Sequence, residues 1–179
     1  MKKILALAGS NSSTSINHQL VLAVASHLEG HSVKVIRLTD YELPMFGEDL
    51  EREQGFSESL KSLLSEIEHV DGLIISVNEH NGSVSAFFKN VLDWLSRIEY
   101  KFLENKKILL CSASTGKRGA LSAFEYTQSV LPRYGGEVVY GFNFPNFSDN
   151  FSSEKGIIID PELNKKAMEG VKVLLSELD

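Results

Sequence analysis

A run of polar residues, Asn78-Glu79-His80-Asn81-Gly82-Ser83, lies between an apolar segment at 72–77 and a helical pattern that begins near Ser85. The apolar segment is typical of a strand that is buried on both faces of a parallel sheet. Ligands of such sheets bind just beyond the carboxyl ends of the strands. The sequence therefore predicts a ligand-binding loop here, made by Asn78, Glu79, His80, Asn81 and Gly82.

A second polar loop, Gly9-Ser-Asn-Ser-Ser-Thr-Ser-Ile-Asn17, joins the first apolar segment to a helical pattern. Hydroxyl and amide groups at a helix amino terminus offer donors and a favourable dipole to a phosphate. The loop has neither Gly-Lys-Ser/Thr nor Gly-x-Gly-x-x-Gly, so it fits a monophosphate better than a nucleoside triphosphate or a dinucleotide. The predicted binding residues are Ser10, Ser12, Ser15, Ile16 and Asn17. The competing interpretation is that Ser15 or Asn17 only caps the helix.

A third loop, Ser112-Ala-Ser-Thr-Gly-Lys-Arg-Gly-Ala120, follows the fourth apolar segment. Its glycines let the backbone approach a flat ring, and its peptide groups can bond the polar edge of that ring. Taken alone, such a turn is usually a solvated connection. With two other polar loops at neighbouring strand ends, it predicts a binding role for Ser114, Thr115, Gly116 and Gly119.

The elements that position these loops alternate along the chain. We expect strands at 3–8, 32–38, 72–77, 106–113 and 137–142, and helices at 17–28, 56–70, 85–98, 121–134 and 161–178. Five strand and helix units with short connections predict an α/β fold, a doubly wound five-stranded parallel sheet of order 2-1-3-4-5 with helices on both faces. The connection at 143–153 is open to two interpretations: a lid or subunit contact, or a surface excursion packed by its own phenylalanines.

Length and composition favour one domain spanning residues 1–179. No apolar run approaches the roughly 20 residues that span a bilayer, and the amino terminus is predicted to be a first strand and not a signal peptide. We therefore expect a cytoplasmic protein without a membrane partner. The formal charge of −6, with both signs interspersed, argues against nucleic-acid binding. The single cysteine, Cys111, is expected to be a buried thiol.

The loop at 78–83 and the helix after it resemble a signature of the NADPH-dependent FMN reductase family, whose flavodoxin-like members carry Pro-Glu-Tyr-Asn followed by Leu-Lys-Asn-Ala-x-Asp-Trp-Leu-Ser. The first loop is similar to the family's Gly-Ser-x-Arg-x-x-Ser-x-Asn, which holds the FMN phosphate, and the third to its Ser-x-Gly-x-x-Gly-Gly. Leu43-Pro44 resembles the family's turn after the second strand. The matching loop and helix residues are Gly9, Ser10, Ser15, Asn17, Glu79, Asn81, Gly82, Lys89, Asn90, Asp93, Trp94, Leu95, Ser96, Ser114, Gly116 and Gly119.

The resemblance implies a reductase that binds FMN and takes hydride from NADPH or NADH. Such a reductase would pass electrons to flavin, quinone, azo or similar small-molecule acceptors by ping-pong exchange, without a dedicated catalytic side chain or a metal. The resemblance also implies a homodimer or homotetramer. Lys117 and Arg118 are candidates for attracting the nicotinamide phosphates. The sequence contains no Gly-x-Ser-x-Gly nucleophile motif and no His-Glu-x-x-His zinc motif.

In the three loops the chain departs from the family pattern at four positions: Asn78 and His80 replace Pro and Tyr, Ala120 replaces Gly, and Ser12 stands in place of Arg. The missing arginine charge predicts weakened FMN binding. His80 either contacts the flavin or only fills the loop. These departures leave two alternatives open: a noncatalytic FMN-binding electron carrier, or a flavodoxin-like interaction module without cofactor.

Overall fold

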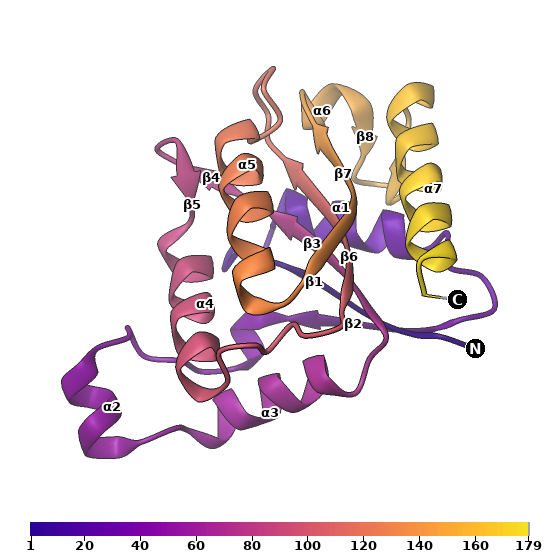
Figure 1. Cartoon of the computed structure of the whole chain (residues 1–179). Helices are drawn as coiled ribbons and strands as arrows, with labels where there is room; N and C mark the ends of the chain where they lie inside the picture. The colour runs from indigo at the N-terminus through magenta and orange to yellow at the C-terminus, as the bar shows by residue number, and fades with distance from the viewer. Residues whose placement is uncertain (179) are drawn as a thin grey trace.

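Five parallel strands form the central sheet of the computed structural model, which describes residues 1–178 (Figure 1). The order β2-β1-β3-β6-β7 is the predicted 2-1-3-4-5 order, and the flavodoxin-like fold class is confirmed. Because every neighbouring pair is parallel, the carboxyl ends of all five strands lie at one edge. The strands are β1 (Lys3–Ala8), β2 (Ser32–Arg37), β3 (Gly72–Val77), β6 (Lys107–Ala113) and β7 (Glu137–Phe144).

Helices cover both faces of the sheet because its strands carry apolar side chains on both sides. Leu5 and Leu7 pack with α3 (Glu58–Glu68), α4 (Ala86–Ile98) and α5 (Leu121–Val130). Ile4 and Ala6, which alternate with them along β1, pack on the opposite face with α1 (Ile16–Ala25) and α7 (Pro161–Ser176). Two separate apolar layers result, and among residues 1–178 no helix combines the length and apolar character needed to cross a bilayer.

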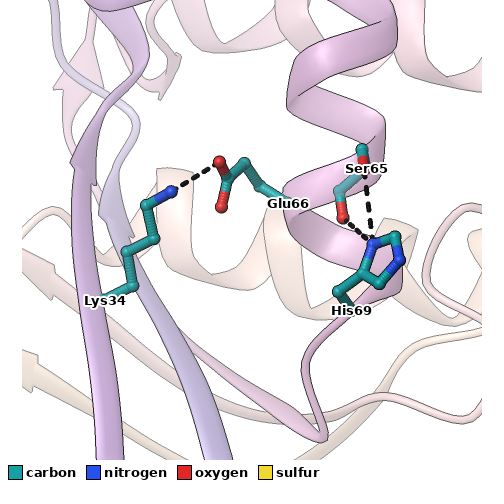
Figure 2. Close-up of polar contacts among 4 residues, drawn as sticks. All are labelled: Lys34, Ser65, Glu66 and His69. Carbon is teal, nitrogen blue, oxygen red and sulfur yellow. Dashed lines mark hydrogen bonds and ion pairs between the residues drawn. The ribbon is translucent and has the colours of Figure 1, made fainter.

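An ion pair joins α3 to the edge strand β2, and a second polar contact lies at the carboxyl end of α3 (Figure 2). The Lys34 ammonium lies 2.5 Å from the Glu66 carboxylate, and this hydrogen bond raises the pKa of Lys34. His69 ends the helix, with its ring Nδ1 2.7 Å from the Ser65 carbonyl oxygen. The tautomer that protonates Nδ1 donates to a carbonyl of the last helical turn. The Lys34–Glu66 pair therefore supplements the apolar packing of α3 on the sheet, and the His69 contact closes the end of the helix itself.

Several short elements were not predicted. Helix α2 (Glu48–Gln54) has no buried residue and projects from the body in Figure 1. The predicted helix at 121–134 instead ends at Val130 and continues as a 3₁₀ turn, η2 (Leu131–Tyr134). The remaining short elements are η1 (Leu38–Asp40), the hairpin of β4 (Glu79–His80) and β5 (Ser83–Val84), α6 (Phe147–Asn150), and the hairpin of β8 (Phe151–Ser152) and β9 (Ile157–Ile158).

The connection at 143–153 agrees with the second of its two interpretations. Phe144, Phe147 and Phe151 are buried, and the rings of Phe147 and Phe151 stack with their centroids 4.6 Å apart. The aromatic side chains therefore pack the excursion against the body of the protein. Cys111 in β6 is also buried as expected, and its burial raises the thiol pKa.

Two residues of α4 hold the loop that follows β2. The Trp94 indole N–H donates to the Pro44 carbonyl at 2.7 Å, and the Asn90 side-chain oxygen accepts from the Phe46 N–H at 2.7 Å. The rings of Phe46 and Trp94 meet edge to face. Asn90 and Trp94 of the signature helix therefore have a structural role in positioning residues 44–46.

Candidate functional site

Three loops at the carboxyl edge of the sheet enclose a cleft of about 300 Å³. This volume lies at the lower end of the range for small-molecule pockets. The cleft joins most of the predicted binding residues from all three loops. Its lining consists of Ser10, Ser12, Thr14, Ser15, Ile16, Asn17, Asn78, Glu79, His80, Ala113, Ser114 and Thr115. Thr14 and Ala113 were not predicted, although both belong to the predicted loops.

The first loop presents unpaired backbone donors at the start of α1. Ser15 caps the helix, because its hydroxyl oxygen accepts from the His18 N–H at 3.1 Å. The N–H groups of Ile16 and Asn17 belong to the open first turn of α1, and no residue in 1–178 accepts from them. Hydroxyls of the loop stabilise its own turns; the Ser12 oxygen, for example, accepts from the Thr14 N–H. The helix start therefore offers two N–H groups and a favourable dipole to an anion.

The side chain of Asn17 is engaged inside the protein. Its oxygen accepts from the Ser76 hydroxyl at 2.7 Å and from the Ala113 N–H at 2.9 Å, while its NH₂ group donates to the Ala113 carbonyl at 3.1 Å. The side chain is almost completely buried. Asn17 therefore braces the ends of β3 and β6 with its amide and has its backbone N–H available for a ligand.

The second loop contains a buried polar atom that lacks a partner. The Asn78 side-chain oxygen is inaccessible to solvent, and no residue in 1–178 donates to it. The NH₂ group of the same amide lies 3.2 Å from the His80 ring Nε2. A buried acceptor without a partner costs about 1–3 kcal/mol. Because Asn78 lines the cleft, its unpaired oxygen is a candidate acceptor for a donor group of a ligand.

Glu79 caps a helix that begins 42 residues later in the sequence. One carboxylate oxygen accepts from the backbone N–H groups of Ser122 and Ala123, at 2.9 and 3.3 Å. The residue that precedes α5, Ala120, has a left-handed backbone and no side-chain acceptor. Glu79 therefore supplies the cap that α5 lacks and joins the second loop to the third.

Asn81 and Gly82 form the turn of the β4–β5 hairpin. Both have positive φ, 51° and 77°, as a two-residue hairpin turn with right-handed twist requires. Asn81 lines a neighbouring hollow with His80, Lys89 and Tyr126, whereas Gly82 lines neither hollow. The sequence contained a sufficient signal for this hairpin, because Asn-Gly is a strong marker of such turns.

The third loop places Ser114 and Thr115 on the cleft and uses its glycines to shape the wall. Gly119 has φ 58°, and a Cβ added there would lie 2.9 Å from the Pro145 nitrogen. The Ser112 hydroxyl donates to the Gly119 carbonyl at 2.6 Å. Gly116 and Gly119 do not line the cleft. Both glycines shape the loop that carries Ser114 and Thr115, and their binding role stays a prediction.

The cleft has little positive charge to offer an anion. None of its lining residues in the described chain is Lys or Arg, and its one carboxylate is Glu79. Lys117 and Arg118 are exposed on the turn, where Arg118 contacts the Ser122 hydroxyl. The pKa of His18, in the first turn of α1, is lowered by burial and secondarily by the Arg37 charge, which favours the neutral ring. Backbone N–H groups and hydroxyls are therefore the main donors.

Comparison with known proteins gives a consistent result. A family model described as NADPH-dependent FMN reductase matches residues 2–149. An uncharacterized protein of Mycoplasma pneumoniae is 36% identical over 151 residues, covering 79% of this chain and 89% of the relative. The quinone reductase of Escherichia coli K12 is 28% identical over 129 residues, covering 72% of this chain and 65% of the enzyme.

A solved structure shows the same fold. FerB, a flavoenzyme NAD(P)H:(acceptor) oxidoreductase from Paracoccus denitrificans, aligns with a TM-score of 0.78 and 23% identity, covering 99% of this chain and 97% of FerB. The shared fold therefore covers nearly the whole chain, including the residues after 149.

Proposed function

The chain belongs to the NADPH-dependent FMN reductase family, and on that premise we propose that it binds FMN in the three-loop cleft and transfers electrons from NADPH or NADH to a small-molecule acceptor. The observation that carries the proposal is the pair of unpaired N–H groups of Ile16 and Asn17 at one end of a cleft enclosed by the three family-like loops. A phosphate matches these donors.

The residues of the cleft fit the two chemically different ends of FMN. The α1 end, with Ser10, Ser12, Ser15 and the two free N–H groups, would hold the phosphate. The other loops would hold the uncharged part, with the unpaired oxygen of Asn78 meeting a ligand donor and the peptide groups near Ser114 and Thr115 meeting the ring edge.

When bound, FMN supplies the hydride and electron chemistry, and the protein supplies binding, orientation and exclusion of water. Glu79 and His80 are the titratable side chains of the lining. The Glu79 carboxylate is committed to capping α5, and the His80 ring contacts the Asn78 amide. We therefore propose that turnover needs no dedicated proton-transferring side chain. His80 would modify the surroundings of the flavin through its contact with Asn78 but would not be essential for turnover.

The acceptor and the assembly are further parts of the proposal. The E. coli relative is named a quinone reductase, and a structure of similar fold is named an azoreductase, so we propose quinones or azo compounds as acceptors. We also propose a cytoplasmic homodimer or homotetramer, as the family-like helix α4 implies. Light scattering of the protein as it elutes from a size-exclusion column would measure its molar mass and so test the assembly.

Anaerobic reduction tests the proposed activity. FMN-loaded protein mixed with NADPH or NADH under nitrogen should lose the visible absorbance of its oxidised flavin. Added quinone should restore the absorbance, and steady-state rates should give parallel double-reciprocal lines. Flavin that stays oxidised with both nicotinamides would contradict the reductase assignment and favour an electron carrier. Protein that binds no FMN would favour the interaction module.

A further inference from the structure

Glu79 links the second and third loops, which form the end of the cleft proposed above to hold the flavin ring (the ring end). The link is made at the amino terminus of α5. We infer that Glu79 is a positioning residue that fixes the orientation of the flavin, an inference that rests on the proposed function. By occupying the α5 amino terminus it leaves the α1 amino terminus as the anion site of the cleft. It also holds the wall against which the uncharged end of the ligand lies.

The start of α5 depends on this carboxylate. Ala120 has φ 61° and ψ 40° and offers no side-chain acceptor, so the first N–H groups of α5 would otherwise lack a protein partner. Glu79 Oε2 accepts from the second and third of them, those of Ser122 and Ala123. A helix amino terminus carries about half a positive charge, which the carboxylate opposes.

The two helix starts at the cleft therefore differ in electrostatic character. At α1 the first N–H groups are unpaired and the cap is the neutral Ser15 hydroxyl. At α5 two N–H groups are already paired with a full negative charge. A phosphate dianion placed beside Glu79 would meet a like charge, whereas at α1 it would meet open donors. The arrangement therefore favours one orientation of the ligand, with its phosphate at α1 and its uncharged part near Glu79.

The same contact joins two walls of the cleft. Glu79 belongs to β4, directly after β3, and Ser122 and Ala123 follow the loop after β6. Asn78 and His80 flank Glu79 in the lining, and Ser114 and Thr115 lie in the other wall. Loss of the carboxylate would release these walls from each other without touching the α1 end. The expected consequence is weaker binding of the part of the ligand that lacks phosphate.

Binding of FMN and riboflavin by the variant pair Glu79→Ala and Glu79→Gln tests the inference. Glu79→Ala should weaken both flavins by the same factor, on the order of tenfold, because it removes two charge-assisted hydrogen bonds at the shared ring end. Glu79→Gln keeps an acceptor oxygen and should restore most of the affinity. Asp160→Ala is the matched control, since Asp160 caps α7 by accepting from the Leu163 N–H and does not line the cleft.

Competition by inorganic phosphate tests which helix amino terminus of the cleft accepts an anion. Phosphate should compete with FMN in every variant, but it should reduce riboflavin binding only in Glu79→Ala, where the α5 amino terminus is open. Sodium chloride at equal ionic strength corrects for screening. The inference would be overturned if Glu79→Ala had the same flavin affinities as Asp160→Ala, or if it lost affinity for FMN alone. It would also be overturned if phosphate did not reduce riboflavin binding by Glu79→Ala.

Hydrogen exchange of flavin-free protein separates this inference from the proposed function. Amides of the β4–β5 hairpin should exchange faster in Glu79→Ala, on the order of tenfold, and remain protected in Asp160→Ala. Unchanged exchange in the hairpin would show that Glu79 does not hold the two loops together. Wild-type protein that binds neither flavin would overturn the proposed function, and the exchange result would still decide whether Glu79 couples the walls.

Discussion

The side-chain amide of Asn17 bonds to both the N–H and the carbonyl of Ala113, at 2.9 and 3.1 Å. The Ser76 hydroxyl donates to the same amide oxygen. One buried side chain therefore joins the start of α1 to the ends of β3 and β6. These three elements carry the three loops of the cleft, so their relative position depends on Asn17.

Replacing Asn17 with Ala should destabilise the fold. The change leaves the Ala113 peptide groups without their partner, and we expect the free energy of unfolding to fall by about 2–4 kcal/mol. Urea unfolding followed by circular dichroism measures it. Asn164→Ala, on the surface of α7, is the control and should change stability by less than about 0.5 kcal/mol. Equal effects of the two substitutions would show that the Asn17 contacts contribute no special stability.

The sequence predicted the sheet because its signals are local. The apolar run at 72–77, for example, matches β3 as observed, since burial on both faces requires it. Helix α2 was not predicted because its residues, Glu48–Gln54, have no apolar stripe and none of them is buried. The role of Glu79 could not be predicted, because its partners, Ser122 and Ala123, are distant in sequence.

Two glycines that both have positive φ, Gly119 and Gly82, should respond differently to substitution by alanine. Gly119→Ala adds a Cβ 2.9 Å from the Pro145 nitrogen, so strain and steric overlap together should cost about 3 kcal/mol. Gly82→Ala has positive φ but meets nothing within 4 Å, and should cost roughly 1–2 kcal/mol. Urea unfolding of both variants measures the difference. Equal losses would mean that the wall near Pro145 moves aside easily.

The buried His18 should make stability depend on pH. Its folded pKa is lowered by burial and by Arg37, so below the unfolded pKa of about 6.5 the unfolded chain takes up a proton that the folded chain resists. Stability is therefore unaffected by this group at higher pH and decreases as the pH falls through 6.5 toward the folded pKa. Urea unfolding from about pH 7.5 to about pH 5 should show that the free energy of unfolding declines less steeply in His18→Phe than in the wild type. Parallel declines would exclude His18 as a contributor.

Restoring a positive charge in the first loop should strengthen FMN binding. No Lys or Arg lines the described cleft, and the exposed Ser12 lies in its lining beside the α1 amino terminus. Ser12→Arg should add a charge-assisted contact to the phosphate of about 1–2 kcal/mol, which is roughly a tenfold gain in affinity. Riboflavin has no phosphate, so its affinity should stay the same. Fluorescence titration of both flavins measures the two effects.

Ser13→Arg provides the matched control for that gain. Ser13 is exposed and adjacent in sequence but does not line the cleft. The same added charge placed there should improve FMN affinity only through long-range attraction, which added salt screens within about 10 Å at 0.1 M. A gain in Ser12→Arg that exceeds the gain in Ser13→Arg at 0.1 M salt would indicate a direct phosphate contact. Equal gains would mean that net charge alone governs binding, and a gain for riboflavin would place the new arginine at the wrong end of the cleft.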